Sequence, residues 1–303
     1  MNSDSTPTAP YLAGLRSVAL NVPDLAVGED FYTRVWHLDV VAREPDAIYF
    51  RGTGAAHHIL SLHQAEKTSI RDVTFNARSI DAMKAMIEAA PAAGGQVVKP
   101  LGEITEPGGG TGFTMKDPDG RIFRFVFGDA VHTDTAEQKD RPIRLAHSVL
   151  NSHDVAASQR FMETVMHFKL SDRTRIMAFM RCNSDHHSIA LGDANEDSLN
   201  HIAFMMPDLE SVMRGGGRMK DAGFPIQWGP GRHGPGNNSF NYFIGPFGVV
   251  IEYTSEVQQV DDTYRTGSPD DWKWPAGRVD HWGISNAPSA DLKEAQKSIF
   301  FAA

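Results

Sequence analysis

The sequence contains a single cysteine, Cys182, among its 303 residues. One cysteine excludes a disulfide within the chain and is typical of a protein from a reducing compartment. A lone cysteine can also be a catalytic nucleophile, but residues 180–183 carry no signal for a helix start or a neighbouring base. We therefore interpret Cys182 as a small residue of a strand.

Clustered positive charge and long apolar runs are also missing. The formal net charge is −9, and no cluster of Lys and Arg occurs. Nucleic acids and anionic membranes are bound by clustered cations, so neither is expected as a partner. No apolar run approaches the ~20 residues that span a bilayer. Residues 1–10 are polar and contain proline, which predicts a disordered arm rather than a signal peptide. We expect a soluble, cytoplasmic protein.

The sequence does contain an internal repeat. Ser17 and the residues after it match His147 and its successors at an offset of 130 residues. Asp72 matches His201 at an offset of 129, and residues 117–124 match residues 245–252 at an offset of 128. A nearly constant offset over separate segments indicates a tandem duplication.

Each half of the duplication divides again into two β-α-β-β-β units. Short strands with alternating polarity are followed by helices with apolar periodicity, and each helix has a start signal. These signals are Asp24, Ser79, Asp154 and Asp208. The prediction is an α+β fold of four units in two domains. The predicted segments are a first domain over 11–133, a linker over 134–140, a second domain over 141–257, and an aromatic tail over 258–303 that forms a lid or an interface.

Three residues of the second half form a candidate metal site. His147 and His201 lie in the first strands of the third and fourth units, and Glu252 lies in the last strand. A carboxylate inside the apolar run 248–253 costs several kcal/mol if it is buried without a partner. Two imidazoles and one carboxylate are the ligands of non-haem Fe(II) sites with open positions.

Other interpretations of these residues remain. A single histidine in a strand is more often a hydrogen-bonded core residue, and Glu196 or Glu256 could be the carboxylate near a site. The repeat favours the metal site, because the matching residues of the first half are Ser17, Asp72 and Arg124. These three make no comparable ligand set, so one half would bind a metal and the other would be a structural copy.

The duplicated units and the His, His, Glu pattern resemble the vicinal oxygen chelate superfamily. Within it, residues 11–257 resemble the two-domain type I extradiol dioxygenases of the catechol 2,3-dioxygenase and 2,3-dihydroxybiphenyl 1,2-dioxygenase type. The resemblance implies a metal in the second domain only, with a catechol and O₂ as substrates in bacterial aromatic degradation. It implies Fe(II), and Mn(II) stays open because it accepts the same ligands. The aromatic tail and the habit of the family favour a homo-oligomer.

The resemblance also implies catalytic residues. His187, in the run 186–191, corresponds to the acid/base histidine, with His186 as its competitor, and the matching pair His57-His58 would be structural. His233 corresponds to a histidine that contacts substrate, and Tyr242 to a tyrosine near the substrate oxygens. Surface positions are expected for His153 and His167. Five apolar residues belong either to a pocket or to the core: Met177, Phe179, Phe204, Met206 and Phe243.

Two alternative functions remain within the same superfamily. Ring-cleaving dioxygenases of hydroquinones share the ligand triad, so the sequence does not separate them from catechol-cleaving enzymes. A glyoxalase-like isomerase or lyase would need a second carboxylate, which Ser17, Asp72 and Arg124 do not supply convincingly.

Overall fold

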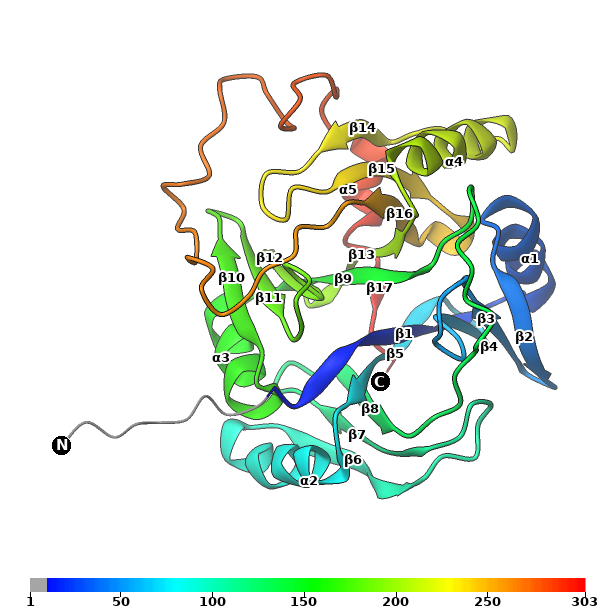
Figure 1. The fold of residues 1–303 in the computed structure, drawn as a ribbon, viewed down its shortest axis with the longest axis vertical. Coiled ribbons are helices and arrows are strands. Elements are labelled where there is room, and N and C mark those ends of the chain that lie inside the picture. The colour runs from blue at the N-terminus through cyan, green and yellow to red at the C-terminus, as the bar shows by residue number, and fades with distance from the viewer. Residues whose placement is uncertain (1–9, 303) are drawn as a thin grey trace.

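The structure, a computed structural model, describes residues 10–302 and contains two β-sheets with the same strand order (Figure 1). The arm predicted over residues 1–10 lies outside the described residues except for Pro10. The first sheet has eight strands, in the spatial order β2 (Asp39–Glu44), β3 (Ala47–Arg51), β4 (Leu60–Gln64), β1 (Leu12–Val22), β5 (Ser69–Ala77), β8 (Ile122–Phe127), β7 (Thr111–Lys116) and β6 (Gln96–Glu103).

The second sheet repeats this order and adds a short strand from the end of the chain. Its path is β10 (Lys169–Arg173), β11 (Met177–Arg181), β12 (Ile189–Asp193), β9 (Arg144–Ser152), β13 (Ser198–Met205), β16 (Val250–Ser255), β15 (Ser239–Ile244) and β14 (Trp228–Arg232). The added strand β17 (Ile299–Phe300) pairs with β13. In each sheet two β-α-β-β-β units meet along their first strands, which confirms the predicted fold class.

The first four helices begin at the predicted start signals, and a fifth helix lies in the tail, where the sequence analysis predicts none. They are α1 (Leu25–Asp30, continued by a π-helical turn over Phe31–Val35), α2 (Ile80–Ala89), α3 (Val155–Met166), α4 (Leu209–Asp221) and α5 (Ala290–Ala295). In α1 to α4 the predicted start residue accepts a hydrogen bond from a backbone N–H of the first turn, which satisfies one of the free donors there. None of the helices within residues 10–302 combines the length and apolar character needed to cross a membrane.

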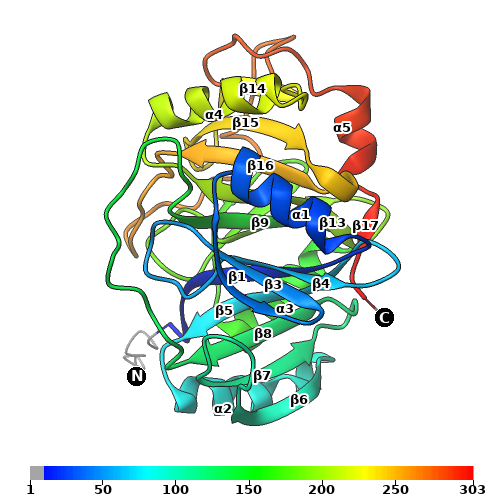
Figure 2. The ribbon, with the colours of Figure 1, turned by 90° about the vertical axis from the view of Figure 1, so that its right-hand side faces the viewer.

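The two sheets share one continuous core. Trp36, at the end of the first helical segment, is fully buried, and its ring stacks on Tyr253 of β16 at 3.6 Å between ring centroids. The Tyr253 hydroxyl donates a hydrogen bond to the Trp36 carbonyl at 3.0 Å. Phe31 meets Phe224 edge to face nearby. Figure 2 accordingly shows α1 lying beside β16, so the first half of the chain packs directly behind the sheet that carries the candidate site.

A buried ion network makes a second connection between the halves. The guanidinium of Arg121 has no solvent-exposed surface and donates to Asp117 at 2.8 Å and to Asp119 at 2.7 Å. It also donates to Asp197 at 2.6 Å and to the Asn151 carbonyl at 3.0 Å, both in the second half of the chain. The hydrogen bonds that the Arg121 guanidinium donates are thus charge-assisted, and without it these carboxylates would lose their neutralising cation.

Replacing Arg121 by alanine is expected to lower the free energy of unfolding by about 3–5 kcal/mol, because it leaves buried carboxylates without their cation. Denaturant unfolding of the two proteins would measure the difference. Arg34, which forms an exposed i,i+4 pair with Asp30, is the matched control. Arg34→Ala should leave the unfolding midpoint unchanged, and equal midpoint shifts for both variants would contradict the importance of the network.

Candidate metal centre and its pocket

Three adjacent strands bring His147, His201 and Glu252 to one face of the second sheet. Ala203 of β13 is the cross-strand partner both of His147 on β9 and of Glu252 on β16. Directly paired residues have side chains on the same face, and so do residues two apart in a strand, so His201 joins them. Because Ala203 itself is small, the space between the three longer side chains stays open.

The three side chains approach one another closely. The Nε2 atoms of His147 and His201 lie 3.1 Å and 3.2 Å from Oε2 of Glu252. All three donor atoms lie within 4.8 Å of one another, and Glu252 has no exposed surface. The other carboxylate oxygen, Oε1, is buried and has no hydrogen-bond partner among the described residues, although Nε2 of His233 lies 3.6 Å away.

Burial and neighbouring groups set the charge of the cluster. Burial alone would raise the pKa of Glu252, but the imidazoles of His147, His201 and His233 outweigh it and hold the pKa well below its usual range. Burial lowers the pKa of His201 to about 4. At neutral pH, Glu252 is therefore an ionised carboxylate, and His201 is neutral.

Hydrogen bonds behind His201 determine which of its nitrogens carries the proton. The Asn200 side-chain oxygen accepts from Gln296 at 2.9 Å and lies 2.8 Å from Nδ1 of His201. An amide oxygen only accepts, so Nδ1 of His201 donates and Nε2 is left with its lone pair toward Glu252. Two electron-rich atoms 3.2 Å apart and out of water require a cation between them. The residues present thus fit a divalent metal ion.

His187 lies next to this cluster and His186 faces away from it. Both residues lie in the segment just before β12. The His187 ring lines the pocket with its centroid 4.3 Å from that of His147, and burial lowers its pKa well below the usual value. Nε2 of His186 instead lies 2.7 Å from the Asp172 carboxylate, and His186 does not line the pocket.

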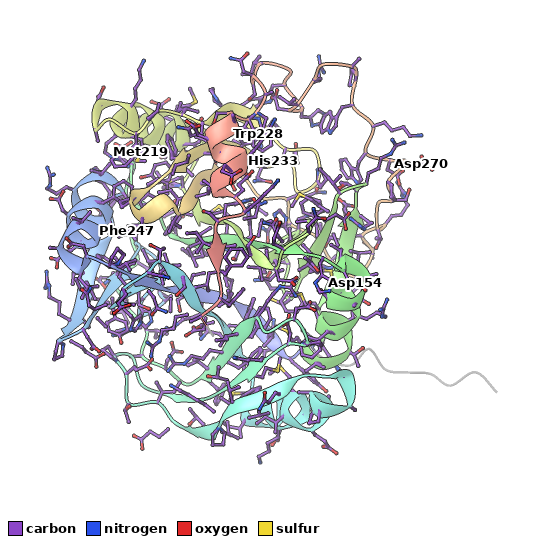
Figure 3. The ribbon with its side chains drawn as sticks, turned by 180° about the vertical axis from the view of Figure 1, so that it is seen from behind. Asp154, Met219, Trp228, His233, Phe247 and Asp270 are labelled. Carbon is purple, nitrogen blue, oxygen red and sulfur yellow. The ribbon has the colours of Figure 1, made fainter. Side chains whose placement is uncertain are left out.

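Tyr242 and His233 complete the polar side of the pocket. Tyr242 is the cross-strand partner of Glu252, and its hydroxyl lies 3.0 Å from Nε2 of His233 and 3.4 Å from Nε2 of His201. Burial and the charge of Glu252 raise the pKa of Tyr242 well above 10, so it stays protonated and can donate. Figure 3 shows Trp228 and His233 side by side next to α5, and their ring centroids are 5.3 Å apart.

The remaining wall of the pocket is apolar and comes largely from the tail. The cavity has a volume of about 550 Å³. Met177 and Phe179 line it, whereas Phe204, Met206 and Phe243 are core residues. The tail runs past β10 and rises to β14 (orange in Figure 1). The sequence analysis expects this tail to form a lid or an interface without naming its pocket residues, which are Trp272, Trp274, Val279, Pro288, Lys293 and Gln296.

The corresponding place in the first sheet contains an ion pair. Thr74 is the cross-strand partner of Ser17 and of Arg124, as Ala203 is of His147 and Glu252. Arg124 pairs with Glu106, so a cationic side chain stands where the second sheet has its carboxylate. The repeat therefore keeps its frame and changes its chemistry, as the sequence comparison of the halves predicts.

The other residues singled out in the sequence lie away from the pocket. His153 is exposed and pairs with Asp197, and His167 ends α3 at a φ of 55° with its ring stacked on Tyr11. Cys182 is buried just after β11, and burial raises the pKa of its thiol to about 12. Such a thiol is not a nucleophile at neutral pH, in agreement with a packing role.

Comparison with known proteins defines the class to which this fold and site belong. The family model of the Glyoxalase/Bleomycin resistance protein/Dioxygenase superfamily matches residues 14–125 and 144–253. These segments make up more than half of the chain and coincide with the two sheets. The chain belongs to this superfamily, and the resemblance seen in its sequence is confirmed.

Relatives within the superfamily include ring-cleaving dioxygenases. The chain is 28% identical to Metapyrocatechase 2 of Cupriavidus necator over 286 residues, or 86% of this chain and 83% of the relative. It is 34% identical to the Mn(II)-bound glyoxalase from Novosphingobium aromaticivorans, with a TM-score of 0.87 and coverage of 93% and 94% of the two chains. A homoprotocatechuate 2,3-dioxygenase variant from B. fuscum shares the fold at 22% identity, with a TM-score of 0.81 and coverage of 93% and 82%.

Proposed function

We propose that this protein is an extradiol ring-cleaving dioxygenase that holds Fe(II) through His147, His201 and Glu252 and opens a catechol with O₂. The observation that carries the proposal is the buried Glu252 carboxylate facing the lone pair of His201 at 3.2 Å. The kinship with Metapyrocatechase 2 supports the same reaction class. When bound, the metal ion would supply a Lewis acid with open positions for both reactants.

The side chains around the ligands suit this reaction. His187 is neutral because of its burial, and its Nε2 makes no hydrogen bond among the described residues, so it can take a proton from a catechol hydroxyl. Nε2 of His233 can donate to the Tyr242 hydroxyl at 3.0 Å, which leaves the Tyr242 hydrogen free to donate to charge that develops on the substrate oxygens. The aromatic wall excludes water and orients a flat ring over the ligand cluster.

The pocket also favours a class of substrate. Its lining contains Trp228, Trp272 and Trp274 together with Met177 and Phe179. A cavity of about 550 Å³ is larger than one ring requires. We propose a catechol with an apolar substituent as the substrate. A role in bacterial aromatic degradation in the cytoplasm, with assembly into a homo-oligomer, accompanies this proposal.

The identity of the metal and a second candidate function belong to the same proposal. Fe(II) and Mn(II) accept the same nitrogen and oxygen ligands, and the similar structure from N. aromaticivorans is described with Mn(II). That structure is also described as a glyoxalase, which favours a metal-dependent isomerase as the second candidate function. Against it, no Asp or Glu lines the pocket walls within residues 10–302, so the second carboxylate of a glyoxalase-like site is missing there.

The protein purified without oxygen and loaded with Fe(II) is expected to consume O₂ and form a yellow product with catechols. Oxygen uptake and visible absorbance with catechol, 3-methylcatechol and 2,3-dihydroxybiphenyl would test this, and the pocket predicts the highest kcat/KM for the last. Loading with Mn(II) in parallel would compare the two metals. Tight metal binding without oxygen uptake on any catechol would contradict ring cleavage and favour the isomerase.

Replacing Glu252 by alanine is expected to abolish metal binding, because it removes the only carboxylate of the proposed ligand set and leaves two imidazoles. Metal analysis of the purified variant after loading and desalting would measure the loss. Glu256, a partly exposed carboxylate four residues further on that pairs with Arg232, is the matched control. Glu256→Ala should retain a full equivalent of metal, and retention by Glu252→Ala would exclude Glu252 as a ligand.

Replacing His187 by alanine is expected to keep the metal and to lower kcat by about 10²–10⁴-fold, the usual contribution of a general base. Steady-state oxygen uptake per bound metal would measure the effect. His58, which occupies the corresponding position in the first sheet, is the matched control. His58→Ala should preserve kcat per metal, and full turnover by His187→Ala would remove His187 from the mechanism.

A further inference from the structure

Asp172 is a fully buried carboxylate on an edge strand of the second sheet, outside the pocket. Its Oδ1 accepts the backbone N–H of Gly267 at 2.7 Å. Its Oδ2 accepts the hydroxyl of Tyr264 at 3.1 Å and lies 2.7 Å from Nε2 of His186. All three partners therefore meet an acceptor, and the proton between Asp172 and His186 is on the imidazole.

This arrangement determines the tautomers of both adjacent histidines. With its hydrogen on Nε2, facing the Asp172 carboxylate, the His186 ring has an Nδ1 that can only accept. Nδ1 of His187 lies 3.0 Å from that atom, so Nδ1 of His187 must donate. The hydrogen of neutral His187 is then on Nδ1, and Nε2 has a free lone pair. A general base that lines the pocket needs this tautomer.

The duplicated first half provides an internal comparison. His57 and His58 make the same Nδ1 to Nδ1 contact at 3.0 Å. Ala42, which pairs with Tyr49 as Asp172 pairs with Phe179, occupies the position of the carboxylate. There Arg16 lies 2.5 Å from Nε2 of His58 and holds it as an acceptor from the other side.

The second half has the opposite residues at these two positions: a carboxylate in place of Ala42 and an alanine in place of Arg16. Its counterpart of Arg16 is Ala146, the residue before the ligand His147, so no side chain covers Nε2 of His187 from that position. The carboxylate that fixes the tautomer is that of Asp172, which contacts His186 on the side away from the pocket. The exchange does not alter the contact within the pairs, because both keep an Nδ1 to Nδ1 distance of 3.0 Å. It leaves the reactive nitrogen of one pair open to the pocket.

The tail is shaped to reach Asp172. A Cβ at Gly267 would lie 2.4 Å from Oδ1 of Asp172 and 2.6 Å from Nε1 of Trp272, so only glycine permits this approach. Gly267 also pairs with Asp172 as an isolated β-bridge. Tyr264 and Gly267 thus bring the tail onto the carboxylate just before Trp272 enters the pocket wall.

We propose that Asp172 is a positioning residue that acts through His186 to fix the ring orientation and tautomer of His187, with Nε2 of His187 unprotonated and open to the pocket. The inference rests on the proposed function, because it assigns a purpose to the base of that reaction. Asp172 and His186 themselves do not touch the substrate.

Asp172→Asn tests this proposal with little change of shape. The Gly267 N–H still requires an acceptor at 2.7 Å, so the amide oxygen must stay there and the NH₂ group must face His186. Nε2 of His186 then accepts, and the tautomer of His187 is inverted. Long-range ¹H–¹⁵N spectra of metal-free, histidine-labelled protein should show His187 protonated on Nδ1 in the wild type and on Nε2 in the variant, with His187→Ala assigning the signal.

Kinetics of the Fe(II)-loaded protein give the second readout. Asp172→Asn should lower kcat for 2,3-dihydroxybiphenyl about 10–100-fold, the usual effect of losing an outer hydrogen-bond partner. Metal content and anaerobic substrate affinity should change less than about two-fold. Asp117→Asn, which alters an equally buried carboxylate bonded to Arg121, is the matched control and should reduce stability with unchanged kcat per metal and an unchanged His187 tautomer.

Two results would overturn the inference. One is a wild-type His187 protonated on Nε2, a measurement that requires no variant to fold. The other is an Asp172→Asn protein with an unchanged tautomer or an unchanged kcat. Absence of oxygen uptake by the wild type with every catechol would instead overturn the proposed function, and the tautomer measurement would still stand.

Discussion

The negative charge of Glu252, fully buried in the middle of a sheet, is the constraint on which the rest of the second domain depends. An isolated carboxylate in such a position costs several kcal/mol unless ions and hydrogen bonds compensate it. The surrounding strands meet this cost with imidazoles from β9 and β13 and with a small residue, Ala203, that leaves room between them. Yet Oε1 of Glu252 remains without a hydrogen-bond partner among the described residues. This unpaired oxygen supports the proposed metal site, whereas Arg124 and Glu106 of the first sheet already satisfy each other as an ion pair.

The duplication shows which features belong to the frame and which to the chemistry. Both sheets keep the strand order, the cross-strand pairing around the central residue and the pair of adjacent histidines before the fourth strand. In the first half, charged side chains fill the space that the second half leaves open, and Arg16 covers the nitrogen that corresponds to the reactive one of His187. The first half nevertheless supports the second, since Trp36 and Tyr253 stack at 3.6 Å behind the strands of the proposed metal ligands. Rigid support of this kind keeps ligands within the narrow tolerance that metal geometry demands.

Much of this arrangement could be predicted from the sequence, because the informative signals are local or repeated. The helix starts follow from side chains that cap their own first turn, and a constant offset aligns His147, His201 and Glu252 with residues of a different kind in the first half. The sequence favours His187 over His186 only through family resemblance, and the structure adds that His187 lines the pocket whereas His186 contacts Asp172 outside it. Asp172, Asn200 and Gln296 could not be found in this way. Their roles depend on contacts between segments far apart in the chain, and nothing in their local sequence separates them from surface polar residues.

The contacts of the tail could not be predicted from the sequence either, and they account for its mixture of aromatic and polar residues. It reaches the site at two points: Gly267 and Tyr264 contact Asp172 behind His187, and Gln296 at the end of α5 contacts Asn200 behind His201. Between these points it contributes Trp272 and Trp274 to the pocket wall. A segment that only covered the pocket would need apolar residues, but this one also donates hydrogen bonds to Asp172 and Asn200, which contact the neighbours of the proposed base and the proposed metal ligand. In His201 and His187 the pocket-facing nitrogen is unprotonated for the same reason, because an acceptor outside the pocket holds the hydrogen on the other nitrogen of each ring. The same tail segment therefore both forms part of the pocket wall and orients the histidines that face the pocket.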